Sequence, residues 1–156
     1  MSVLIRHEDF DVAQVMAEMR AQSNNVGAMV TFVGLVRDMS YDAQVNNIEV
    51  QHYPGMSEKA LEKIIAEAHR RWELIDARVI HRIGTLGPND QIVLVATASS
   101  HRGNAFSSCE FIIDYLKTDA PFWKKEVKPV GGEWVETKDS DIQRMQRWNY
   151  DTQVKR

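Results

Sequence analysis

Apolar residues recur at helical spacing in the first half of the chain. One helix is predicted to begin after Asp11, since the apolar residues there lie three and four positions apart: Val12, Val15, Met16 and Met19. A second is predicted over 58–72, with Ser57 as its N-cap. Its apolar face comprises Leu61, Ile64, Ile65, Ala68 and Trp72. Both patterns indicate helices that cover a core on one side only.

Two more helices are predicted in the second half. The first covers 104–117 and ends before Pro121, because proline lacks a backbone donor and restricts the preceding residue. Its spacing places on one face Phe106, Cys109, Ile113 and Leu116. A short last helix, capped by Asp139 or Ser140, ends near Trp148.

Runs of β-branched and apolar residues predict the strands. We expect a short edge strand at 2–8, a buried strand at 28–38 and a half-buried one at 45–53, then strands at 77–84 and 91–100, and a hairpin of 123–129 with 132–137. Gly34 indicates a bulge or a close backbone approach. Helices and strands do not alternate strictly, so the predicted fold class is α+β, with a mixed or mostly antiparallel sheet packed with helices.

Composition sets the class of protein. The 156 residues suit a single domain, which we place at 1–148, with a flexible tail at 149–156. The formal net charge of -3 disfavours a nucleic-acid partner. No apolar run approaches the roughly 18 residues of a membrane span, and no secretory signal is evident, so we expect a cytoplasmic protein.

Candidate chemistry begins with lysines set among aromatic residues in "DYLKTDAPFWKKE". Lys117 falls beside the apolar stripe of the 104–117 helix. It is either a rim residue paired with Asp114 and favoured by the helix dipole, or a cation held at a pocket. Cys109 lies within the stripe, where a thiol has a raised pKa and is a poor nucleophile, so we interpret it as core.

A second group of cations lies in "SSHRGN", between an apolar strand and the 104–117 helix. His101 and Arg102 stand at the helix N-terminus, which favours anions, and Lys117 lies at the far end of the same helix. A solvated loop is an equal alternative. Arg37, after the "TFVGLV" run, is a third candidate. No nucleotide-binding motif and no metal-ligand spacing is present, so we expect an anionic small ligand and neither metal nor cofactor.

Five segments in this order resemble the large, catalytic subunit of molybdopterin synthase: "TFVGLVRD", "HYPGMSEKAL", "VIHRIGTLGPND", "SSHRGNAF" and "DYLKTDAPFWKKE". The resemblance implies an α+β fold with a hammerhead-type subdomain. It also implies a sulfurtransferase that converts cyclic pyranopterin monophosphate to molybdopterin. Two sulfurs would come from the thiocarboxylate on the C-terminal Gly-Gly of a small ubiquitin-like partner. The implied assembly is a heterotetramer around a central dimer of large subunits.

The resemblance also assigns residues. The essential lysines would be Lys117 and Lys124, and the pterin and its phosphate would be held by these two together with Arg37, His101, Arg102 and Lys125. Leu35 stands where relatives often carry a lysine, which places one phosphate contact in doubt. Lys138 stands where a basic residue from the dimer mate reaches the site.

Two other functions stay open on the sequence alone. The chain could bind an anionic ligand or a ubiquitin-like tail without chemistry, although the presence of both Lys117 and Lys124 favours an enzyme. It could also bind single-stranded RNA by stacking bases on Phe122 and Trp123, which the net negative charge disfavours.

Overall fold

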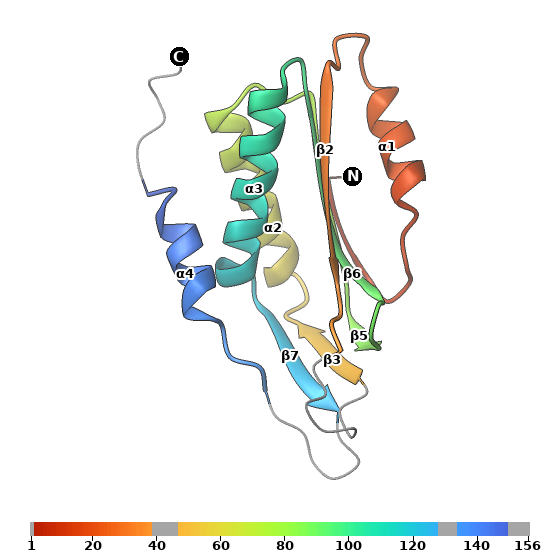
Figure 1. Ribbon diagram of the computed structural model, residues 1–156, viewed down its shortest axis with the longest axis vertical. Coiled ribbons are helices and arrows are strands. Elements are labelled where there is room, and N and C mark those ends of the chain that lie inside the picture. Colours follow the sequence, from red (N-terminus) through yellow and green to blue (C-terminus); the bar gives the residue numbers. More distant parts are fainter. Residues whose placement is uncertain (1, 39–46, 128–133, 150–156) are drawn as a thin grey trace.

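A computed structural model describes residues 2–38, 47–127 and 134–149. In chain order its elements are β1 (Val3–Arg6), α1 (Val12–Arg20), β2 (Ala28–Leu35), β3 (Asn47–His52), α2 (Met56–Arg71), β4 (Asp76–Arg82), β5 (Gly84–Leu86), β6 (Gln91–Ser99), α3 (Arg102–Asp119), β7 (Phe122–Val127) and α4 (Asp139–Gln146). The predicted α+β class is confirmed (Figure 1).

The strands form two sheets. The larger has the order β1-β4-β6-β2, in which β1 runs parallel to β4 and the other pairs are antiparallel. The smaller has the order β5-β3-β7 and is antiparallel. The hammerhead-type subdomain stays a prediction.

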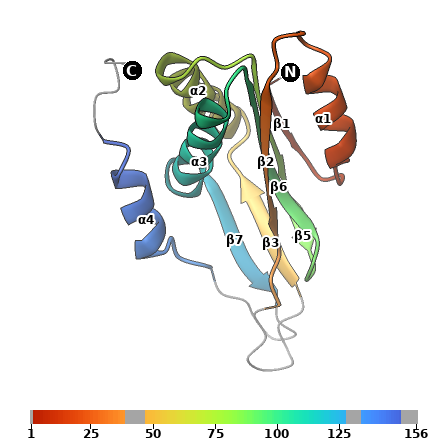
Figure 2. The same ribbon diagram turned by 45° about the horizontal axis from the view of Figure 1, so that its top comes forward.

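Helices cover both faces of the larger sheet (Figures 1 and 2). On one face α1 encloses a small core that includes Phe10, Met19 and Leu94. On the other, α2 and α3 enclose the main core, and α4 packs on the outer side of α3. This double covering explains why the β6 sequence is continuously apolar, since a strand with both faces buried has no polar side.

Several predicted details are wrong. Ser57 and Asp139 or Ser140 are not caps: α2 begins after Gly55, which has a φ of +83°, and α4 begins after Lys138. The 28–38 strand is only half-buried, because β2 lies at the sheet edge. Phe106 is 62% exposed, because the buried face of α3 comprises Ala105, Ser108, Cys109, Phe111, Ile112, Asp114 and Leu116.

Other expectations hold in part. The register shifts between Gly34 and Leu35, as predicted, and a Cβ on Gly34 would lie 2.7 Å from Val93. In the described part of the second hairpin strand, 134–137, one bridge forms, between Lys125 and Trp134. Residues 128–133 and the predicted tail from 150 lie outside the described residues. The short β5 was not predicted. Nowhere in the described ranges is a helix both long enough and apolar enough to span a membrane.

Candidate active site

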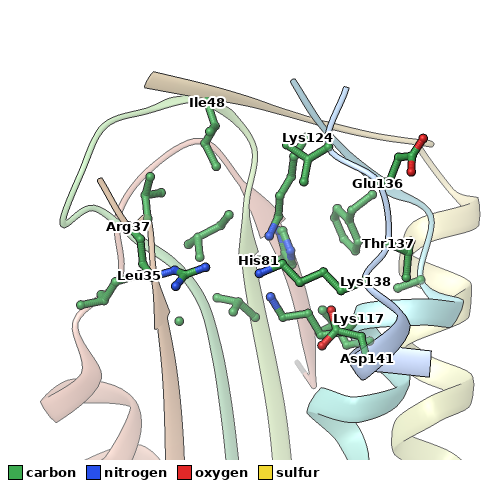
Figure 3. Close-up of a pocket in the computed structure, with 18 of the residues that line it drawn as sticks. Leu35, Arg37, Ile48, His81, Lys117, Lys124, Glu136, Thr137, Lys138 and Asp141 are labelled. Carbon is green, nitrogen blue, oxygen red and sulfur yellow. The ribbon is translucent and has the colours of Figure 1, made fainter. Parts of the chain in front are cut away.

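A cavity of about 370 Å³ opens where the two sheets meet the end of α3 and the start of α4 (Figure 3). Its deep part is apolar and includes Val93, Leu116 and Phe122. Its polar lining is more basic than acidic: Arg37, Lys117, Lys124, Lys138, His81, Asn47, Thr137, Ser140, Glu126, Glu136 and Asp141. An apolar floor under basic side chains favours an anion with a flat or apolar portion.

Lys117 is placed by the last turn of α3. The predicted rim pair with Asp114 is wrong, because Asp114 is only 5% exposed and faces α4. The Asp114 carboxylate accepts hydrogen bonds from Trp148 Nε1 at 2.7 Å and Arg147 Nη2 at 2.8 Å. The Lys117 side chain instead extends into the cavity (Figure 3).

Lys124 is placed by β7, which pairs with β3 so that Lys124 lies opposite Val50. The turn before β7 is fixed by Ser57, whose hydroxyl donates to the Pro121 carbonyl at 2.8 Å. The Lys124 side chain points into the cavity, and burial, followed by repulsion from Lys117, lowers its pKa to about 8. This amine therefore changes charge close to physiological pH.

Lys125 does not line this cavity, because alternate residues of a strand face opposite sides. Its amine lies 5.6 Å from the centre of the Trp134 ring, a cation–π arrangement. The structure thus separates Lys125 from the Lys117 and Lys124 pair within one chain.

Arg37 reaches the opposite wall of the cavity (Figure 3). The backbone before it is fastened to the 87–90 turn: Val36 N–H donates to Asp90 O at 2.9 Å, and Asn89 N–H donates to Val36 O at 2.8 Å. Leu35, just before, is 52% exposed at the cavity edge.

Lys138 directly precedes α4 and Asp141 lies in its first turn, and both line the same chain's cavity. Asp114 connects α4 to α3 through Arg147 and Trp148, which sets where this segment lies. In this structure, Lys138 therefore reaches the cavity of its own chain, whereas the family resemblance implied that it reaches the site of a dimer mate.

His101 and Arg102 lie at the other end of α3. Fifteen helical steps separate Arg102 from Lys117, which amounts to about 22 Å along the axis. Neither residue is part of the cavity lining described above, and both are exposed. Of the six predicted substrate-binding residues, a single chain brings together Arg37, Lys117 and Lys124.

His81, on β4, was not singled out from the sequence. It is 2% exposed and lines the cavity, near the amines of Lys117, Lys124 and Lys138 in Figure 3. The only local signal in the sequence is a histidine inside the apolar run "ARVIHRIG". Within the described ranges, no group of three or more His, Cys, Asp or Glu side chains could hold a metal ion.

Cys109 is 3% exposed and does not line the cavity. Burial raises the pKa of its thiol to about 12. A thiol that stays protonated is a poor nucleophile, so any sulfur chemistry in this cavity needs an external donor.

Comparisons with known proteins give matches over most of the chain. The family model of the MoaE protein matches residues 5–119. The molybdopterin synthase catalytic subunit from Vibrio cholerae is 53% identical, over 94% of this chain and 97% of the relative. The one from Ralstonia nicotianae is 50% identical, over 94% of this chain and 84% of the relative. The solved molybdopterin biosynthesis MoaE protein from Burkholderia ambifaria superimposes with a TM-score of 0.83 at 51% identity, covering 96% of this chain and 99% of that one.

Proposed function

The chain belongs to the MoaE protein family, and from this premise we propose that it is the catalytic subunit of a molybdopterin synthase. It transfers two sulfurs from the thiocarboxylated C-terminus of a small ubiquitin-like partner to cyclic pyranopterin monophosphate, in the cytoplasm. The observation that carries this proposal is the convergence of Arg37, Lys117 and Lys124 on one apolar-floored cavity.

The reaction has an electrostatic problem that this cavity can solve. The pterin phosphate and the thiocarboxylate are both anions, and unit charges about 4 Å apart interact by about 4 kcal/mol at an effective dielectric of about 20. Cations between them cancel this repulsion and act more strongly in a partly dry site than in water. Three basic side chains from different elements surround the space where the two anions would meet.

In the proposed sequence, the thiocarboxylate sulfur attacks a carbon of the pterin side chain while a C–O bond at that carbon breaks. The oxygen keeps the electron pair and leaves as a phosphate oxygen or, once protonated, as water, and the carrier becomes linked to the pterin as a thioester. Water then cleaves the acyl–sulfur bond, so that the sulfur stays on the pterin and the carrier leaves as a carboxylate. A second charged carrier repeats the step. Cys109 takes no part, consistent with its burial away from the cavity.

Each residue has a proposed role. Lys117 orients the thiocarboxylate and exchanges protons with the reacting groups. Lys124 stabilises developing negative charge, which requires its ammonium form and therefore a pH below its pKa of about 8. Arg37 binds the phosphate with charge-assisted hydrogen bonds.

His101 and Arg102 complete the phosphate site only from a second copy of the chain, because about 22 Å of helix separates Arg102 from Lys117 in the same copy. This requirement supports the proposed central dimer of large subunits. Lys125 retains no role in the cavity of its own chain, since it faces Trp134.

The test is reconstitution with purified thiocarboxylated carrier and cyclic pyranopterin monophosphate, with the pterin product followed by mass spectrometry. We expect a dithiolene product and two spent carriers for each pterin. If the chain binds both partners and the pterin gains no sulfur, the protein is a binding module and the proposed function is wrong.

A further inference from the structure

His81 has a fixed orientation and a fixed protonation state. Its Nδ1 lies 2.8 Å from the backbone carbonyl of Arg82, and a carbonyl only accepts, so Nδ1 carries the proton. The ring stacks on Phe122, with centroids 3.8 Å apart and planes 12° apart. Burial, opposed by the Arg82 hydrogen bond, lowers the His81 pKa to about 3. The imidazole is therefore neutral, and Nε2 is its acceptor nitrogen.

The surroundings of this lone pair are cationic. Phe122 and Lys124 lie two residues apart on β7 and so face the same side, which places Lys124 on the side of the strand where Phe122 stacks on His81. Figure 3 shows the amines of Lys117, Lys124 and Lys138 all pointing toward the part of the cavity where His81 lies. Both lysines act electrostatically on His81, Lys124 more strongly than Lys117.

A neutral acceptor does something here that a carboxylate cannot. An ammonium needs hydrogen-bond acceptors once it leaves water, and an aspartate or glutamate would satisfy it while cancelling its charge. An imidazole nitrogen satisfies one N–H and leaves the full positive charge for an anionic ligand. The site thus keeps a half-buried lysine in place without neutralising it.

We propose that His81 is a positioning residue for sulfur transfer: Nε2 accepts a hydrogen bond from the Lys124 ammonium and directs its remaining N–H groups at the reacting anion. This inference rests on the proposed function, because it assigns Lys124 an anion to stabilise. His81 itself exchanges no proton and forms no bond to substrate.

Two substitutions separate positioning from packing. His81→Phe keeps an aromatic ring against Phe122 and removes the acceptor. His81→Gln gives up the stack and retains a side-chain oxygen near the position of Nε2. If His81 only fills space, the Phe variant should keep more of the parental rate than the Gln variant. If His81 positions Lys124, the Gln variant should keep more of that rate than the Phe variant.

The readout is the pH profile of the single-turnover rate, paired with ¹⁵N NMR titration of the Lys124 amine. Other charged or titratable groups that line the cavity are unchanged in both variants: Arg37, Lys117, Lys138, Glu126, Glu136 and Asp141. His52, which also acts on His81, is likewise unchanged. A shift in the Lys124 titration can therefore be assigned to position 81.

Loss of an acceptor for the charged form lowers the pKa of Lys124, so His81→Phe is expected to move the titration and the alkaline limb down by about one pH unit. The rate at pH 7 falls on the order of tenfold. His81→Gln restores most of both. The inference is overturned if the Phe variant keeps the parental titration and rate, or if Gln is the worse variant.

The readouts also separate the two proposals. If the parent does not transfer sulfur, the proposed function fails, whereas the NMR titration still reports whether His81 holds the Lys124 ammonium. If His81→Phe does not fold, His81→Leu serves as the acceptor-free variant: a Lys124 titration shifted down relative to the parent and to His81→Gln supports the inference, and one that matches the parent contradicts it.

Discussion

Replacing Lys124 with methionine should stabilise the protein while it removes activity. The Lys124 pKa lies at about 8, against 10.5 for a free lysine, and burial is the main cause. A shift of this size means that charging Lys124 costs about 3 kcal/mol more in the folded than in the unfolded chain. Methionine has a similar length and no charge, so Lys124→Met removes that cost. Imperfect packing of the new side chain offsets part of this stabilisation, so we expect the free energy of unfolding at pH 7 to rise by at least about 1 kcal/mol.

The stabilisation by Lys124→Met should depend on pH. Between pH 8 and 10.5 the unfolded chain holds a proton on Lys124 that the folded chain has lost. The cost of the buried charge is thus fully present below about pH 8 and disappears as the pH rises toward 10.5. The advantage of the methionine variant over the parent in free energy of unfolding should therefore shrink across that window.

Urea unfolding at pH 7 and at pH 10 measures both effects. Lys125→Met is the matched control, since it removes a neighbouring lysine that contacts Trp134 on the other side of β7. That control should lose a few tenths of a kcal/mol and show no comparable pH dependence. A Lys124→Met variant no more stable than the parent at pH 7, or an advantage that is the same at pH 10, would refute the argument from burial.

Substitutions at three further positions test the account. Lys117→Ala should lower the single-turnover rate about a hundredfold or more, with the free energy of unfolding and carrier binding unchanged, because Lys117 has no pair with Asp114 to lose. Lys117→Arg keeps the charge and separates proton exchange from orientation. Parental rates in both variants would show that Lys117 is not part of the active site. Cys109→Ser should keep turnover and lose some stability in urea, since a hydroxyl replaces a thiol in the core; loss of turnover in the folded variant would implicate Cys109 in sulfur transfer. Arg102→Ala should weaken pterin binding in titration calorimetry more than it slows chemistry at saturation, and the reverse pattern would contradict a role in phosphate binding.

Local patterns were enough to predict most elements and their order. Pro121 ends α3 as expected, and the shift at Gly34 follows from its close approach to Val93. The details that failed depend on tertiary contacts. Ser57 has the chemistry of a cap, but its hydroxyl is used by the Tyr53 N–H and the Pro121 carbonyl.

The site was predictable only in part for the same reason. Lys117 and Lys124 are seven residues apart, on a helix and a strand, and they converge because β7 pairs with β3. Nothing local to "ARVIHRIG" shows that His81 would lie beneath them. The separation of Arg102 from Lys117, by contrast, follows from helix length alone, so their position on one helix argues against a shared site in one chain.

Isotope transfer tests the central claim most directly. Carrier labelled with ³⁴S in its thiocarboxylate is incubated with cyclic pyranopterin monophosphate and one of three proteins: the parent, Cys109→Ser or Lys117→Ala. The mass of the pterin product is then measured by mass spectrometry. The account predicts two heavy sulfurs in each product molecule with the parent and with Cys109→Ser, and almost none with Lys117→Ala. Unlabelled sulfur in the product, or full labelling with Lys117→Ala, would contradict it.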